Sequence, residues 1–103
     1  MRYTLYQVRK EHRREYGFMS LEERQAILGT KDIDLSVYGV TYQSDVDTEH
    51  PHAALDYLFH VFNLDHPDDF CSYSMSVGDV VHLGDTWWYC DSSGWTPIHT
   101  CRT

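Results

Sequence analysis

The stretch PHAALDYLFHVFN at residues 51–63 carries apolar side chains at the three- and four-residue spacing of a helix that buries one face. These apolar positions are Ala54, Leu55, Leu58, Phe59, Val61 and Phe62. Pro51 suits the first position of a helix, where its missing N–H would have no partner. Three acids just before it, Asp45, Asp47 and Glu49, favour the positive end of the helix dipole. We therefore expect a helix at about 51–63 that packs against a sheet.

Segments with alternating side chains, rich in β-branched and aromatic residues, flank this helix and predict strands. The expected strands lie at residues 2–9, 34–43, 75–83, 86–91 and 95–100. Gly84 and Asp85 predict a hairpin turn between the third and the fourth of them. A short helix is expected to begin after the cap residue Ser20 and to end at Gly29. Residues 10–18 and 65–70 are expected to form irregular turns.

This order of elements predicts the α+β class. The chain of 103 residues is long enough for one domain, which would span residues 1–103. We expect a small, largely antiparallel sheet with both helices packed on one face, the short one and the one at about 51–63. No apolar run approaches the roughly 20 residues of a membrane span, and the first residues lack the apolar core of a signal peptide. The three cysteines form no CxxC pair, which favours reduced thiols and a cytoplasmic protein.

Charge is distributed unevenly along the chain. The net charge is −8, from eight Lys and Arg against sixteen Asp and Glu. Residues 1–31 hold seven of the basic residues and four acids, whereas residues 32–101 hold twelve acids and no Lys or Arg. A surface that binds a phosphate backbone needs Lys and Arg, so residues 32–101 are not expected to bind free DNA. Mixed charge suffices for solubility, and a long stretch without cations therefore indicates an acidic surface directed at a basic partner.

Six acids and three tryptophans are the candidate partner-binding residues. Asp45, Asp47 and Glu49 precede the predicted long helix, and Asp65, Asp68 and Asp69 follow it. Trp87 and Trp88 are neighbours in a predicted strand, so one should enter the core and the other should face outward. The outward one, together with Trp95, would anchor a binding surface, because exposed Trp is enriched at interaction hot spots. The alternative is that both members of the pair serve packing.

Catalysis and metal binding are the alternative roles for the acids, histidines and cysteines of the chain. Acids and histidines are close together at 45–52 and 60–69, and such side chains ligate Zn, Mn or Fe. Their spacing matches no known ligand pattern, so we expect no metal, no cofactor and no catalytic residues. Cys71, Cys90 and Cys101 form no recognisable dyad with the histidines, and no glycine-rich phosphate loop is present. The chain is therefore expected not to be an enzyme.

Three segments carry a resemblance to a known family. They are FNLDHPDDF at residues 62–70, SMSVGDVV at 74–81 and YCDSSGW at 89–95. Together they resemble the YodL-like domain family of bacterial mobile genetic elements, namely conjugative elements, plasmids and phages. That family tends to have Leu, Ser and Phe where this chain has Met75, Gly78 and Trp95. The resemblance extends to residues 3–7 and 37–38 and so covers nearly the whole chain.

Simple local chemistry accounts for much of this pattern. Pro67 with Asp68 and Asp69 suits a turn after the long helix, and Gly94 suits a tight turn. Ser76 and Asp79 can satisfy backbone amides where the following strand begins. We therefore interpret these residues as a fold signature, with no active site to transfer from the family.

The resemblance implies a setting in mobile elements, where proteins protect incoming DNA from host defences. Our leading expectation is a non-enzymatic anti-CRISPR protein whose acidic surface binds the basic nucleic-acid channel of an RNA-guided nuclease. Its partner would be that host defence nuclease or its guide-RNA complex, and no membrane. One alternative is a protein–protein interaction module of a conjugative element, which would bind another mobile-element protein without any anti-defence role. The other is a metal-dependent enzyme that uses the Asp and His clusters.

Overall fold

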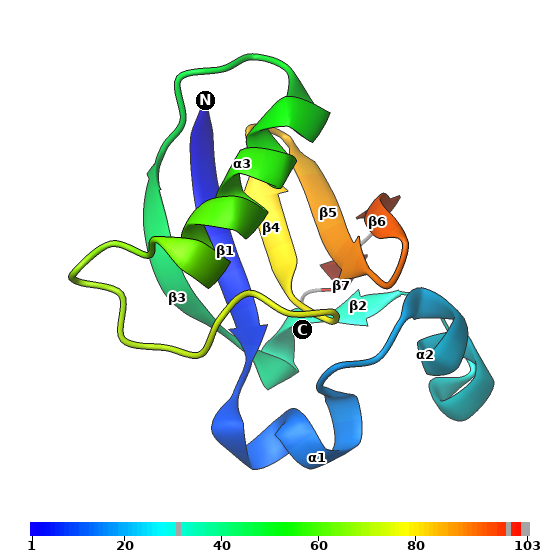
Figure 1. Ribbon diagram of the computed structural model, residues 1–103. Helices are drawn as coiled ribbons and strands as arrows, with labels where there is room; N and C mark the ends of the chain where they lie inside the picture. Colours follow the sequence, from blue (N-terminus) through cyan, green and yellow to red (C-terminus); the bar gives the residue numbers. More distant parts are fainter. Residues whose placement is uncertain (31, 99, 102–103) are drawn as a thin grey trace.

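Strand β1, Arg2–Val8, pairs along both of its edges and organises a five-stranded antiparallel sheet of order β3-β1-β4-β5-β6 (Figure 1). The computed structural model describes residues 1–30, 32–98 and 100–101. The other strands of this sheet are β3 Tyr38–Asp45, β4 Val80–Leu83, β5 Thr86–Asp91 and β6 Gly94–Ile98. A parallel pair, β2 Ile33–Asp34 and β7 Thr100–Cys101, forms a second small sheet. The α+β class and the antiparallel sheet are confirmed.

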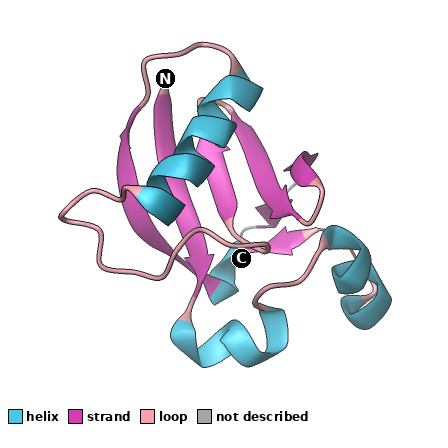
Figure 2. Cartoon of the chain, in the orientation of Figure 1, coloured by secondary structure: helices cyan, strands magenta, loops and turns pink. Residues whose placement is uncertain are grey.

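The helical segments lie outside the sheet. They are the 3-10 turns η1 Lys10–His12 and η2 Leu35–Val37 and the helices α1 Arg13–Tyr16, α2 Leu21–Leu28 and α3 Pro51–Leu64. Helix α3 runs across one face of the sheet, whereas α1 and α2 lie beyond the end of the sheet where β1 ends (Figure 2). Among the described residues, no helix combines the length and the apolar character that a membrane span requires.

Helix α3 forms where the sequence predicts it and buries the expected stripe. Ala54, Leu55, Leu58 and Phe62 are buried against Leu5 and other side chains of the sheet. The remaining buried partners on this face are Tyr3, Val46, Phe70, Met75, Val81, Leu83 and Trp88. One apolar position departs from the prediction, because Phe59 lies at the edge of the stripe and is 40% exposed.

A second apolar cluster covers the opposite face of the sheet. Val80 and Tyr89 belong to it, whereas their strand neighbours Val81 and Trp88 belong to the α3 cluster, as the alternation of strand side chains requires. Leu21 of α2 packs in this second cluster with Tyr38 and others. We expected both helices to pack on the same face of the sheet. This is wrong for α2, because α3 packs on one face and Leu21 of α2 belongs to the cluster on the other.

Two predicted strands begin later than expected because side chains turn the chain first. The carboxylate of Asp34 accepts a hydrogen bond from the Ser36 amide at 2.9 Å, and this holds the 3-10 turn that precedes β3. Before β4, the carboxylate of Asp79 accepts a hydrogen bond from the Ser76 amide at 2.8 Å, and the Asp79 amide donates to the Ser76 carbonyl at 3.0 Å. The expected irregular segment 10–18 contains η1 and α1, which have no buried residue. The predicted final strand agrees with β6 but extends over residue 99, which lies outside the described residues.

Candidate binding surface around helix α3

The six candidate acids lie at the two ends of α3. Asp45, Asp47 and Glu49 precede its first turn, Asp65, Asp68 and Asp69 follow its last, and all six are exposed. The 14 residues of α3 rise about 1.5 Å each, so roughly 21 Å of helix separates the two groups. The structure thus places the acids in two clusters along one helix, which we call the α3 surface together with the exposed side of α3.

The first cluster is carried by a loop whose backbone is fixed. The amino group of Met1 donates to the Val46 carbonyl at 2.7 Å, and the Val46 amide donates to the Met1 carbonyl at 2.9 Å. The buried side chain of Val46 anchors the same loop in the core. Asp45 lies 3.6 Å from Arg2, but their side chains are 69% and 61% exposed, so this pair contributes little to stability.

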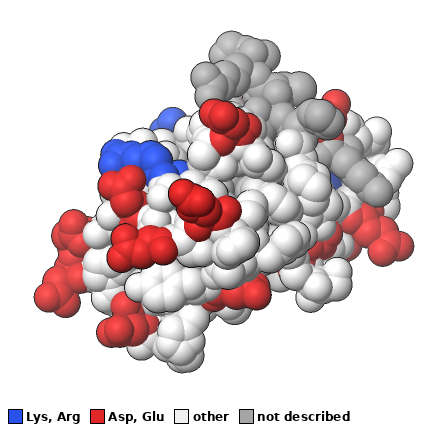
Figure 3. Space-filling model, turned by 90° about the horizontal axis from the view of Figure 1, so that it is seen from above, with Lys and Arg blue, Asp and Glu red and all other residues white. Residues whose placement is uncertain are grey.

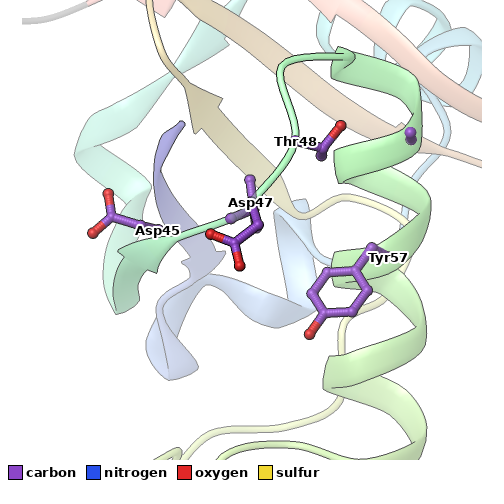
Figure 4. A pocket seen from close by; sticks show the side chains of 6 residues that line it. Asp45, Asp47, Thr48 and Tyr57 are labelled. Carbon is purple, nitrogen blue, oxygen red and sulfur yellow. The ribbon is translucent and has the colours of Figure 1, made fainter.

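A hollow of about 440 Å³ lies between this loop and α3. Residues 45–48 line it from the loop, and Ala53 and Tyr57 line it from the helix. Asp47 and Tyr57 point toward this space, whereas the carboxylate of Asp45 points away from the helix (Figure 4). The hollow therefore combines a carboxylate with an exposed aromatic ring.

The second cluster sits on a turn held by an aromatic anchor. Phe70 is buried with its ring centroid 4.8 Å from that of Phe62, and its amide donates to the Pro67 carbonyl at 3.0 Å. The hydroxyl of Tyr42 donates to Asp69 at 2.9 Å, and this hydrogen bond raises the pKa of Tyr42. The predicted turn around Pro67 is confirmed, and it presents Asp68 and Asp69 to solvent.

The three tryptophans divide between the two faces of the sheet. Trp88 is buried under α3, with its ring 5.0 Å from that of His52, whereas Trp87 lies on the other face and stacks on His82 at 4.0 Å. Trp88 enters this core, as predicted for one of the pair, but Trp87 is half-buried and packs against the second apolar cluster, so both members serve packing, which was the alternative. Trp95 pairs with Cys90 across the strands and therefore shares the face of Trp88. Trp87 and Trp95 consequently cannot form one surface, contrary to the expectation.

A second groove, of about 300 Å³, lies on the other flank of α3, against the hairpin of β5 and β6. Its lining includes Asp56 and Phe59 from the helix and Trp95 from the hairpin. Asp56 is not among the residues predicted to bind a partner. The spacing of Phe59 predicts a buried position, and only the place of the hairpin beside α3 shows that Phe59 borders a groove.

The residues of the family pattern around Asp79 are structural. Asp79 is buried, and Oδ2 accepts hydrogen bonds from the Ser76 amide at 2.8 Å and from Nε2 of Gln7 at 2.9 Å. Tyr73 donates its hydroxyl to Oδ1 at 3.2 Å. Burial raises the pKa of Asp79 to about 7 in spite of these donors. The predicted role of Asp79 is confirmed, whereas the hydroxyl of Ser76 donates to the Ser74 carbonyl at 2.9 Å.

Metal-binding and nucleophilic groups do not converge on this surface. Across residues 1–30, 32–98 and 100–101, no group of three or more His, Cys, Asp or Glu side chains could hold a metal ion. Burial raises the pKa of the Cys90 thiol to about 12, so this thiol is protonated and unreactive at neutral pH. Cys71 is exposed and free.

Negative charge dominates the side of the molecule that carries the first acidic cluster. Seen from above, carboxylates are scattered over the surface, and Lys and Arg atoms are visible only near its margins (Figure 3). This view agrees with the composition of residues 32–101, which contain no Lys or Arg. A partner that approaches the α3 surface therefore meets a negative potential.

Comparison with known proteins identifies one family whose model matches the chain. The model of the YodL-like domain matches residues 2–100, nearly the whole chain. No curated protein and no solved structure matches the chain.

Proposed function

The chain belongs to the YodL-like domain family, and on that premise we propose that it is a non-enzymatic inhibitor of a host defence system of the anti-CRISPR type. Its α3 surface would occupy the basic channel in which an RNA-guided nuclease holds nucleic acid. One observation carries the proposal: three exposed carboxylates lie at each end of α3, within residues 32–101, which contain no Lys or Arg.

The dimensions and charge of the α3 surface suit such a channel. The phosphates of one strand of a duplex rise by about 3.4 Å each along the helix axis, so the roughly 21 Å of α3 spans the rise of about six of them. The two acidic clusters would meet Lys and Arg side chains at both ends of that length. Complementary potentials of this kind raise association rates and make binding sensitive to salt.

A second candidate is a protein–protein interaction module of a conjugative element. It is favoured by the apolar side chains that α3 exposes, Tyr57, Phe59 and Leu64, because aromatic and aliphatic anchors are typical of protein interfaces. The partner would then be another protein of the same element, and inhibition of a defence nuclease would not occur.

Cleavage of target DNA by an RNA-guided nuclease tests the proposal. The nuclease is first captured on the immobilised protein from a lysate of a bacterial host that carries an RNA-guided nuclease, at low and at moderate salt. We expect the parent protein to inhibit the captured nuclease, and a triple variant with Asp47→Lys, Glu49→Lys and Asp68→Lys to lose at least tenfold in potency. The matched control reverses three exposed acids elsewhere, Glu11→Lys, Glu15→Lys and Glu22→Lys, and keeps its potency.

Two results would overturn the proposal. Full inhibition by the α3-surface variant would show that acidic mimicry is not the mechanism. Specific capture of a conjugation protein, without inhibition of any nuclease, would establish the second candidate instead.

A further inference from the structure

The groove between α3 and the β5–β6 hairpin has a chemistry of its own. Its lining residues are Asp56, Phe59, Val77, Cys90, Asp91, Ser92, Gly94 and Trp95. Its volume of about 300 Å³ lies at the lower end of the range for small-ligand pockets, so it suits one long side chain better than a larger ligand.

The two walls of this groove are aromatic and come from different elements. Phe59 projects from α3 with 40% of its side chain exposed, and Trp95 projects from β6 while partly packed against the core. Asp56 stands one turn before Phe59 on the same side of the helix and is exposed. The groove thus combines apolar walls with a carboxylate at its rim.

The described part of the groove lining carries negative charge. Asp56 and Asp91 both belong to it, and none of the described residues that line the groove is Lys, Arg or His. The carboxylate of Asp91 accepts hydrogen bonds from the Ser92 amide at 2.8 Å and the Leu21 amide at 3.3 Å. Because the carboxylate of Asp91 already accepts these bonds, Asp56 is the carboxylate that can contact a bound cation directly. Asp91 adds to the negative potential of the groove.

We propose that this groove binds a single arginine side chain of a protein partner. The guanidinium plane stacks on the rings of Phe59 and Trp95 and pairs with the carboxylate of Asp56, while its aliphatic stem contacts Val77. Lysine fits less well, because its compact ammonium group is strongly hydrated and does not stack as a plane. This inference deepens the proposed function, since it names the residue type with which a basic protein partner contacts the α3 surface.

Binding of short capped peptides tests the proposal directly. The ¹⁵N-labelled protein is titrated with acetyl-Gly-Arg-Gly-amide, and with the same peptide carrying lysine or citrulline, which is a neutral isostere of arginine. We expect saturable amide shifts centred on Asp56, Phe59 and Gly94, together with a shift of the Trp95 indole N–H. The lysine and citrulline peptides should bind at least fivefold more weakly. Equal responses to all three peptides, or shifts centred elsewhere, would overturn the proposal.

Variants on the two flanks of α3 provide a matched control. Asp56→Asn and Phe59→Ala should each weaken binding of the arginine peptide at least fivefold, whereas Asp47→Asn and Tyr57→Ala on the opposite flank should leave it unchanged. All four side chains are exposed, and thermal unfolding confirms that each variant is folded. If the four variants weaken binding equally, general negative charge and not the groove binds the peptide, and the proposal fails.

This test is separable from that of the proposed function. Selective arginine binding without inhibition of a nuclease would support the arginine site and overturn the anti-CRISPR role. Inhibition without selective arginine binding would support the anti-CRISPR role and overturn the arginine site.

Discussion

Gln7 and Asp79, 72 residues apart, form a buried hydrogen bond in which Nε2 of Gln7 donates to Oδ2 of Asp79 at 2.9 Å. The same amide nitrogen donates to the Tyr73 carbonyl at 3.0 Å. The bond therefore fastens the turn before β4 to strand β1, which lies inside the sheet between β3 and β4. It also places a carboxylate where water is excluded, which is the condition that raises the pKa of an acid.

Asp79 should make the protein less stable as pH rises. Its pKa is about 7 in the folded state against an ordinary value of 3.8, so between these values the folded state binds more protons than the unfolded state. The contribution of Asp79 to the free energy of unfolding is then complete below about pH 4 and is lost by about pH 7, with an upper limit of about 4 kcal/mol. Urea denaturation between pH 4 and pH 8 measures this loss.

The variant Asp79→Asn separates the loss of stability caused by ionisation of Asp79 from the effects of the other acids. Asp34, whose pKa is lowered by its hydrogen bonds with Ser36, acts in the opposite direction and is present in both proteins. We expect the difference in stability between the parent and Asp79→Asn to shift in favour of the variant as pH rises from 4 to 7. The exposed control Asp85→Asn should follow the parent curve. A difference between parent and Asp79→Asn that is constant over this range would contradict the prediction.

Elements governed by regular spacing were predictable from the sequence. The apolar stripe of α3, the helix cap at Ser20 and the hairpin at Gly84 each follow from local chemistry. The starts of β3 and β4 were not predicted, because Asp34 and Asp79 redirect the backbone through side-chain hydrogen bonds that strand periodicity does not reveal.

The acids of the candidate surface could be predicted from the sequence, whereas the groove beside α3 could not. Exposure of the six acids follows from their charge and from their positions beside a helix. The groove at Phe59 was not predictable, since it exists only because the β5–β6 hairpin lies against that flank of α3. The register of the β5–β6 hairpin, which pairs Trp95 with Cys90, places Trp87 and Trp95 on opposite faces of the sheet, and this register was not predicted from the sequence.

Gly78 should resist substitution even though the family tends to have serine at this position. Its φ of +101° is a conformation that side chains with a Cβ rarely adopt, and an added Cβ would lie 3.0 Å from the Phe18 nitrogen. We expect Gly78→Ser to lower the free energy of unfolding by about 1–3 kcal/mol. Gly29→Ala is the control, because Gly29 has a φ of +78° in open space and loses only the conformational part, about 1 kcal/mol. Equal losses in the two variants would show that the contact with Phe18 has no effect.

The hydroxyl of Tyr38 should contribute measurably to stability. It is buried and donates to the Gly78 carbonyl at 2.6 Å, which ties β3 to the turn before β4. Tyr38→Phe leaves that carbonyl without this donor in a site closed to water, at a cost of about 1–3 kcal/mol. Tyr57→Phe removes an exposed hydroxyl from α3 and should change stability by less than about 0.5 kcal/mol. Chemical denaturation compares the two, and a Tyr38→Phe variant as stable as Tyr57→Phe would refute the assignment.

Arg24 should be replaceable by an apolar side chain without loss of stability. It is 1% exposed, and its guanidinium lies 5.9 Å from the ring centroids of both Tyr16 and Tyr89. Within the part of the chain that the structure describes, Nε and Nη1 of Arg24 have no hydrogen-bond partner. Burial of a cation with so few partners is costly, whereas the stem of the side chain packs well.

Arg24→Met keeps a similar length and removes the buried charge, so we expect the free energy of unfolding to be unchanged or to rise by about 1–3 kcal/mol. Arg14→Met, at an exposed position of α1, is the control for the loss of one positive charge from an acidic protein and should change stability by less than about 0.5 kcal/mol. Urea unfolding at neutral pH measures both variants. A loss of more than about 1 kcal/mol in Arg24→Met alone would mean that the two tyrosine rings stabilise the buried cation by more than its desolvation costs.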